Sequence, residues 1–173
     1  MVTKWLDPVE QRAWRAMVAV LTRLPGALDT ELQRESEMTH FEYWVLTLLS
    51  EQPDHRLQMN ELAHKANASL SRLSHVVSKL ERMGWAQRSA TAGRRGVHAV
   101  LTDDGYLRLT AATPHYLAAV RQLIFDGLDT GQKARLAELS ELLATHLTDA
   151  LDPSGGLTTA GKNYQYPPGP SEA

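Results

Sequence analysis

The sequence contains no cysteine. This absence excludes disulfides, thiolate zinc sites, iron–sulfur clusters and thiol-based redox sensing, and it fits a protein of a reducing cytoplasm. No uninterrupted apolar stretch is long enough to cross a bilayer, and the N-terminal residues MVTKWLDPVEQ lack the basic-then-apolar layout of a signal peptide. We therefore expect a cytoplasmic protein that does not use a membrane as a partner.

The motifs of common enzyme classes are missing as well. The chain has no P-loop, no GxGxxG after a strand and no nucleophile elbow, and its carboxylates fall at helix starts, where capping accounts for them. The seven histidines, at positions 40, 55, 64, 75, 98, 115 and 146, form no close pair at helical spacing and no HExxH motif. We expect no enzyme activity, no cofactor and no metal; a zinc site assembled only by folding is the alternative.

Charge is distributed unevenly along a chain whose formal net charge is only −2. From Arg56 to Leu101 there are eight lysines and arginines but only two acids, Glu61 and Glu81, so this segment carries +6 and the remainder −8. A basic segment inside an acidic protein indicates either a local surface for a polyanion or an ordinary solvated positive face.

The first third of the chain is predicted to be helical. Asp7-Pro8-Val9-Glu10 is a capping box at a helix start, and a kink or short break is expected at Pro25-Gly26. The charged stretch 29–37 is expected to be solvated. One narrow apolar stripe follows the helix at spacings of three and four residues. It comprises Trp14, Met17, Leu21, Leu24 and Leu28.

The last third is predicted to hold two more helices and a tail. One runs from Thr102 to about Leu128 with a kink at Pro114, and the other from Gly131 to about Leu151. The final helix also has a narrow stripe, formed by Leu136, Leu139, Leu143 and Leu147. Narrow stripes on long helices are typical of packing against a second copy of the chain. The proline- and glycine-rich residues 152–173 are expected to be disordered.

The middle of the chain alternates capped helices and short strands. Thr39 and Glu42 form a second capping box, for a helix to about Ser50 with Tyr43, Leu46, Leu49 and Phe41 facing inward. Asn60 can cap a short helix over 61–65. Ser69 can cap a helix from Leu70 to Met83 that ends at Gly84. Strands are predicted at Trp85–Ser89 and Val97–Leu101, joined as a hairpin.

The polar face of the helix over 70–83 suits nucleic acid. Hydroxyls near its start let the helix approach a surface closely, and arginine or histidine can donate to base edges in a major groove. Lysine and arginine further along, and after the helix, suit phosphates. An ordinary solvated helix face is the alternative. The predicted contacts from this helix and the next strand are Ser69, Ser71, Arg72, His75, Lys79, Arg82 and Arg88.

The hairpin tip carries the sharper signal. Arg94 and Arg95 lie between Gly93 and Gly96, so two long, permanently charged side chains sit where the backbone can turn freely. Arginine at a narrow tip suits insertion into a minor groove, where the negative potential is enhanced. A loop that only aids solubility is the alternative.

The run from about His40 to Gly105 resembles the winged helix-turn-helix of MarR-type (multiple antibiotic resistance) transcriptional regulators. The residues that carry the resemblance are NELAHKA, SLSRLSHVVSKLERMGW, Gln87-Arg88 and GRRGVHAVLTDDG. It implies a mainly α fold with a small β-hairpin wing, flanked by long N- and C-terminal dimerisation helices. It also implies a homodimer on a pseudo-palindromic operator, in many members a repressor released by a small aromatic or phenolic ligand. Residues 1–38 and 103–151 would form the dimerisation region, and residues 39–102 the DNA-binding lobe.

Two features of the chain bear on this resemblance. The family usually has an aspartate shortly before the wing arginine, whereas Thr91, Ala92 and Gly93 stand here, so a looser wing is expected. Aromatic residues and methionines near the lobe could line a ligand pocket, or they could simply be core and dimer contacts. They are Trp14, Met17, Met38, His40, Tyr43 and Trp44. A winged-helix module that binds an acidic protein, and a DNA binder without a small-molecule input, are the alternative functions.

Overall fold

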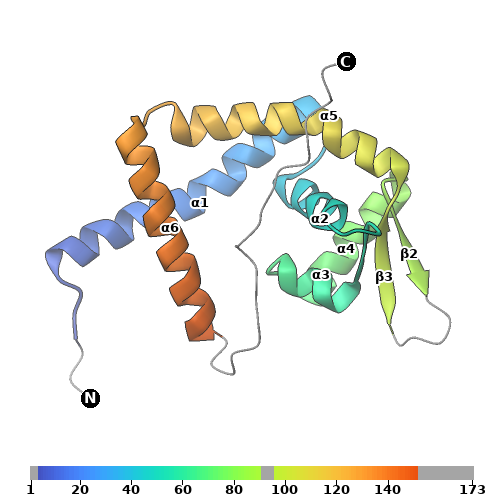
Figure 1. The fold of residues 1–173 in the computed structure, drawn as a ribbon, viewed down its shortest axis with the longest axis horizontal. Helices are drawn as coiled ribbons and strands as arrows, with labels where there is room; N and C mark the ends of the chain where they lie inside the picture. The colour runs from blue at the N-terminus through green and yellow to red at the C-terminus, as the bar shows by residue number, and fades with distance from the viewer. Residues whose placement is uncertain (1–3, 91–95, 152–173) are drawn as a thin grey trace.

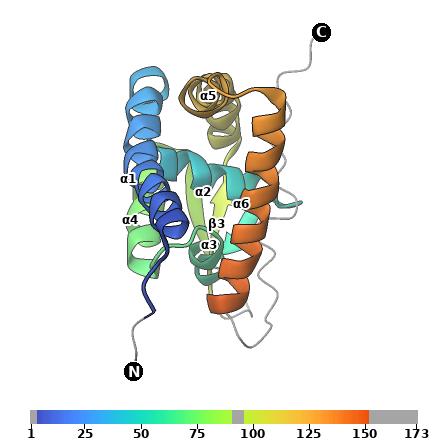
Figure 2. The same ribbon diagram turned by 90° about the vertical axis from the view of Figure 1, so that its left-hand side faces the viewer.

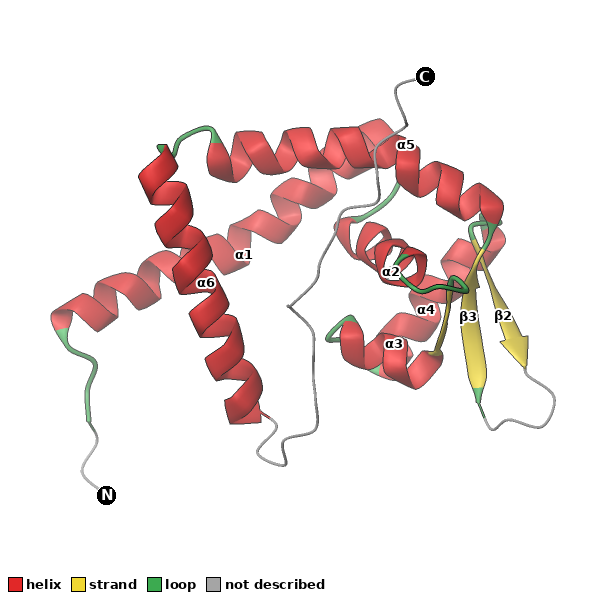
Figure 3. Cartoon of the chain, viewed as in Figure 1, coloured by secondary structure: helices red, strands yellow, loops and turns green. Residues whose placement is uncertain are grey.

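The computed structural model describes residues 4–90 and 96–151 (Figure 1). Helices make up most of the chain, and the strands gather at one end of the molecule (Figure 3). The elements in chain order are α1 (Pro8–Ser36), α2 (His40–Ser50), β1 (Arg56–Gln58), α3 (Met59–Lys65), α4 (Leu70–Arg82), β2 (Ala86–Ala90), β3 (Val97–Leu101), α5 (Asp103–Val120), the π-helical segment η1 (Arg121–Phe125) and α6 (Thr130–Leu151). The winged helix-turn-helix fold predicted from the sequence is therefore present.

Helix α1 begins as predicted but does not break. The Asp7 side chain accepts hydrogen bonds from the backbone N–H groups of Val9 and Glu10, and the Glu10 side chain accepts from the Asp7 N–H in return. A break at Pro25 is wrong, because one helix continues through it to Ser36, and the alternative of a kink there stays a prediction. The stretch 29–37 is not wholly solvated either. Leu32 is 1% exposed, so burial of the helix's second half favours continuity despite the backbone bond lost at the proline.

Helices α2 and α3 start differently from one another. Thr39 and Glu42 make the predicted capping box, and Tyr43, Leu46 and Leu49 are buried as expected. The prediction that Asn60 caps α3 is wrong, because the helix begins at Met59 and its N-cap Gln58 makes no side-chain capping bond. Strand β1 ends where α3 begins, so strand pairing determines this start.

A three-stranded antiparallel sheet replaces the predicted two-stranded hairpin, in the order β1-β3-β2. In it, Arg88 of β2 stands opposite Ala99 of β3, and Leu57 of β1 pairs with Ala99 from the other side. Strand β1 was missed because three residues are too short to show a period, and its partner lies some 40 residues further along the chain.

Helix α4 matches its prediction closely. The Ser69 side chain accepts a hydrogen bond from the Arg72 N–H at 3.2 Å, and Gly84 has a positive φ of 75° just beyond the helix end. That left-handed conformation is one that glycine adopts without strain, so the chain can turn there into β2.

The two C-terminal helices differ from the prediction where α5 ends and where α6 begins. Helix α5 includes Pro114 in a continuous helix, but it ends at Val120 and passes into η1 rather than running to Leu128. Helix α6 begins one residue earlier than expected, at Thr130, after the Asp129 side chain has accepted a bond from the Gln132 N–H. A π-helical turn widens the helix by one residue per turn and cannot be recognised from apolar spacing.

One hydrophobic core connects the lobe to the outer helices. Leu28 and Leu32 of α1 and Leu109 and Tyr116 of α5 belong to the same buried cluster as the α2–α4 side chains. Helix α6 has no buried residue along its whole described length, and it stands apart from α1 when the molecule is turned (Figure 2). None of the helices described is long and apolar enough to cross a membrane.

Candidate nucleic-acid interface

Helix α4 presents three kinds of surface around its circumference. Leu73, Val77 and Leu80 are fully buried against the core. Because successive residues are about 100° apart around an α-helix, a flank lies on each side of this apolar face, and the side opposite the core faces solvent. Each flank is held by a neighbouring element.

The first flank contacts α2 through two of the predicted DNA-binding cations. Arg72 lies over the ring of Phe41, with its Cζ 4.1 Å from the ring centroid. Two turns further on, Lys79 Nζ lies 2.6 Å from Glu42 Oε1, and the Glu42 side chain is only 4% exposed. Loss of Lys79 would leave that buried carboxylate without its counter-charge. Lys79 is therefore committed to the lobe's own structure.

The second flank contacts β2 through Arg88. Its guanidinium donates hydrogen bonds to Ser74, Ser78 and Glu81 of α4, and its side chain is 28% exposed. The sequence predicted Arg88 as a phosphate contact. In the structure its two terminal nitrogens are taken up within the chain, so we assign it a different role below.

A narrow strip remains exposed between the two flanks. Ser71, His75 and Arg82 project from it at spacings of four and seven residues, and all three are exposed. The only acid of α4, Glu81, is paired with Arg88 rather than placed on this strip. The strip therefore offers a hydroxyl, an imidazole and a guanidinium without a nearby α4 carboxylate to repel a polyanion.

The remaining predicted contacts differ in status. Ser69 uses its hydroxyl as the helix cap of α4. Arg94 and Arg95, together with the stretch Thr91–Gly93 in which the family's aspartate is absent, lie outside the described residues. The residues that sequence reasoning missed are those that hold α4, namely Phe41, Glu42, Ser74, Ser78 and Glu81. For Glu81 the sequence did offer a signal, because it is one of only two acids in the basic segment 56–101.

The six residues predicted as a ligand pocket differ widely in their exposure. Met38 and Tyr43 are fully buried in the core, whereas Trp14 is 55% exposed on the outer part of α1. His40 and Tyr43 both stack on Tyr116 of α5, with centroid distances of 5.7 and 4.2 Å. These two side chains fill the α2–α5 junction rather than open it.

Burial changes the hydrogen bonding and the pKa of His40. Its Nδ1 is buried and has no hydrogen-bond partner among the residues described. Desolvation lowers the pKa of His40 below its usual value, and the nearby carboxylate of Asp29 only partly opposes this effect. Burial in the α2–α5 junction therefore favours the neutral form of the imidazole.

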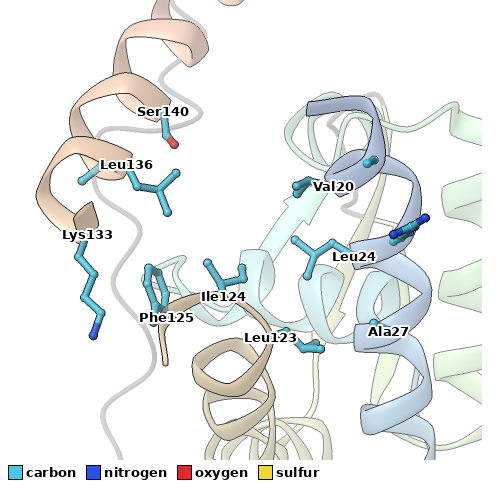
Figure 4. Close-up of a pocket in the computed structure, with 12 residues that line it drawn as sticks. Val20, Leu24, Ala27, Leu123, Ile124, Phe125, Lys133, Leu136 and Ser140 are labelled. Carbon is cyan, nitrogen blue, oxygen red and sulfur yellow. The ribbon is translucent and has the colours of Figure 1, made fainter. Parts of the chain in front are cut away.

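A hollow of about 760 Å³ lies elsewhere, between α1, η1 and α6 (Figure 4). Val20 and Leu24 of α1 face Ile124 and Phe125 of η1 across it, and Leu136 of α6 closes a third side. None of the six predicted residues lines this hollow. Two of the three elements that form its wall, α1 and α6, are the helices whose apolar stripes the sequence assigned to a second copy. Within residues 4–90 and 96–151, no three histidine, aspartate or glutamate side chains are grouped to hold a metal.

Comparison with known proteins shows which family this chain resembles in sequence and in structure. The sequence model of the MarR family matches residues 38–93. The transcriptional repressor MprA of Escherichia coli is 27% identical over 114 residues, which cover 65% of this chain and about 64% of MprA's own length.

Two solved structures from Streptomyces coelicolor are more similar. Sco3205, a MarR family transcriptional regulator solved in complex with DNA, is 41% identical, with a TM-score of 0.77 and coverage of 84% of this chain and 92% of its own. AbsC, another MarR family transcriptional regulator, is 34% identical, with a TM-score of 0.75 and coverage of 84% and 99%. These relatives are regulators rather than enzymes, in agreement with the sequence prediction. Similarity of this extent, over a lobe that carries the family's helices and sheet in order, shows that the chain belongs to the MarR family of transcriptional regulators.

Proposed function

We propose that this protein is a sequence-specific DNA-binding transcriptional regulator that inserts α4 into the major groove. The observation that carries the proposal is the exposed strip of α4, where Ser71, His75 and Arg82 face solvent and the single acid of the helix, Glu81, is paired with Arg88 instead. Ser71 and His75 lie in the first half of the helix and would reach base edges, while Arg82 near its end would contact a phosphate. Arg94 and Arg95 would enter the minor groove. The DNA complex of Sco3205 supports this use of the fold.

The acting unit in this proposal is a homodimer. Residues 1–38 and 103–151 would form the dimerisation region, because α1 and α6 expose large apolar side chains that a monomer leaves in water. Residues 39–102 would form the DNA-binding lobe. A dimer would place its two copies of α4 one helical turn of DNA apart, about 34 Å, and so prefer a pseudo-palindromic operator. The repressor MprA supports repression as the outcome.

The test measures binding of the full-length protein to fluorescent duplexes, one selected by the protein from a random pool and one of random sequence. Wild-type protein should bind both, with affinity that falls steeply as salt rises. Arg82→Ala should weaken both affinities alike and reduce the salt slope by about 1. His75→Ala should weaken only the selected duplex, by about 1–3 kcal/mol. Arg95→Ala should cost a similar amount and also reduce the slope.

The control is Arg15→Ala, which removes the same charge from an exposed position of α1, far along the chain from α4. It should leave binding of both duplexes unchanged. Absence of binding to any duplex, even at low salt, would contradict the proposal and favour the interaction module that binds an acidic protein.

The proposal also includes relief of DNA binding by a small aromatic ligand. The hollow between α1, η1 and α6 is the site we favour for such a ligand, because its wall is largely apolar and includes Arg23 and Lys133 for an acidic group. A panel of aromatic acids tested by thermal shift should raise the unfolding temperature if one binds. No shift with any member would favour a DNA binder without small-molecule input.

A further inference from the structure

Arg88 joins strand β2 to helix α4, which precedes it in the chain and is connected to it by the turn at Gly84. Its Nη2 donates to the carbonyl oxygen of Ser74 at 2.9 Å and to the hydroxyls of Ser74 and Ser78 at 3.1 Å each. Its Nη1 donates to Ser78 Oγ at 3.1 Å and forms an ion pair with Glu81 Oε2. One planar side chain therefore grips two turns of α4 at positions 74, 78 and 81.

The backbone of Arg88 belongs to the same arrangement. Strand β2 lies at the edge of the sheet, so part of its backbone has no neighbouring strand to bond. The Arg88 N–H donates to Glu81 Oε1 at 2.8 Å, so the carboxylate satisfies this edge donor with one oxygen and the guanidinium with the other. Glu81 thus binds both the strand and its side chain.

From this geometry we propose that Arg88, bound by Glu81, is a positioning residue that fixes the angle between the sheet and α4, rather than a contact to DNA. The inference rests on the proposed function. Strand β2 ends at Ala90 and strand β3 begins at Val97. The angle between β2 and α4 decides where this end of the hairpin lies relative to Ser71 and His75. Both grooves can be engaged at once only if that angle is held, so its loss should reduce specific binding more than non-specific binding.

The variant Arg88→Lys separates the two roles. A lysine keeps the positive charge and can serve a phosphate as a point charge, but it lacks the planar fork needed to reach Ser74, Ser78 and Glu81 together. A positioning role predicts that binding of the selected duplex weakens roughly tenfold, as expected for loss of a charge-assisted contact, while random-sequence binding and its salt slope stay unchanged. A direct phosphate contact predicts that Arg88→Lys binds both duplexes like the wild type.

For the variant Glu81→Gln, a pure charge effect and a positioning role predict changes in DNA affinity of opposite sign. Removing an acid from a DNA-binding lobe should strengthen binding if charge alone matters. If Glu81 holds Arg88, the selected duplex should instead bind several-fold more weakly, about 3–10-fold. The matched control is Glu61→Gln, which removes the only other acid of the basic segment from an exposed position on α3. It should not weaken binding of either duplex.

Hydrogen exchange without DNA completes the experiment. Backbone amides of β2 should exchange faster in Arg88→Lys and Glu81→Gln, whereas amides of α2 should be unchanged, because the connection is local. Unchanged β2 exchange, or unchanged selectivity between the duplexes, overturns the inference. If the wild type binds no duplex, the proposed function fails, and faster β2 exchange would still show that Arg88 holds the strand to α4.

Discussion

At the scale of single residues, Phe41 and Glu42 of α2 hold two basic side chains on one flank of α4. Phe41 places its ring against the Arg72 guanidinium, and Glu42 pairs with Lys79 while also capping its own helix. Such contacts reduce the freedom of long basic side chains before any ligand arrives, so less entropy is lost on binding. Cations that resemble free surface charges in the sequence thus have fixed positions.

His40 provides a prediction at the same scale. Its pKa is lowered by burial, so the unfolded chain takes up a proton near pH 6.5 while the folded protein resists it. The contribution of His40 to the free energy of unfolding should therefore be constant above about pH 6.5 and fall as the pH is lowered toward the folded-state pKa. Urea unfolding at pH 7.5 and 5.5 should show that His40→Gln loses stability on acidification less than the wild type does.

The control for this measurement is His115→Gln, at an exposed position of α5. It should keep the pH dependence of the wild type. Equal pH dependence of His40→Gln and the wild type would mean that His40 is not the group responsible.

At the scale of elements, α1 shows how burial can outweigh a local signal. Pro25 lacks a backbone donor and disfavours helix at the preceding residue, yet α1 is one helix of 29 residues. Leu28 and Leu32, buried just after the proline, keep the second half of the helix against the core. The helix therefore carries a local cost that packing offsets.

Replacing this proline should remove that cost. Pro25 is exposed, so Pro25→Ala should raise the free energy of unfolding by about 1–3 kcal/mol, measured in urea at one fixed protein concentration. Pro8→Ala is the matched control, since a proline in the first helical turn has no intrahelical bond to lose and should change stability by less than about 0.5 kcal/mol. A Pro25→Ala variant no more stable than Pro8→Ala would show that α1 accommodates its proline without cost.

At the scale of the whole molecule, the two end helices α1 and α6 leave large apolar side chains exposed in a single chain. Along α6, Leu139, Leu143 and Leu147 are between 45% and 58% exposed, and on α1 Leu21 is 60% exposed. Apolar surface of this extent is typical of an interface rather than of a monomer's exterior. The hollow between α1, η1 and α6 belongs to the same surface.

Assembly should depend on that surface. Sedimentation of the wild type should give a dimer, and the double variant Leu139→Glu, Leu143→Glu should give a monomer, because two carboxylates would be desolvated in the interface. Leu107→Glu is the control, since Leu107 of α5 is 66% exposed and lies outside both stripes. A dimer in the double variant, or a wild-type monomer at micromolar concentration, would place the interface elsewhere or remove it.

The fold was largely predictable because its signals are local. The caps at Asp7, Thr39 and Ser69 and the glycine at position 84 act within four residues, and apolar spacing reveals which helix face packs inward. Strand β1 escaped prediction for the opposite reason. Its three residues are a strand only because β3 passes beside them, and pairing over that separation leaves no trace in a short window.

The candidate site was predictable in composition but not in arrangement. The basic segment and the polar face of α4 were visible in the sequence, and helical spacing alone places Ser71, His75 and Arg82 on one face. The ion pairs of Lys79 and Arg88 within the lobe depend on the folded arrangement, because their partners Glu42 and Glu81 come from other elements. Periodicity places a side chain around its own helix. What that side chain touches depends on which other elements folding brings beside it.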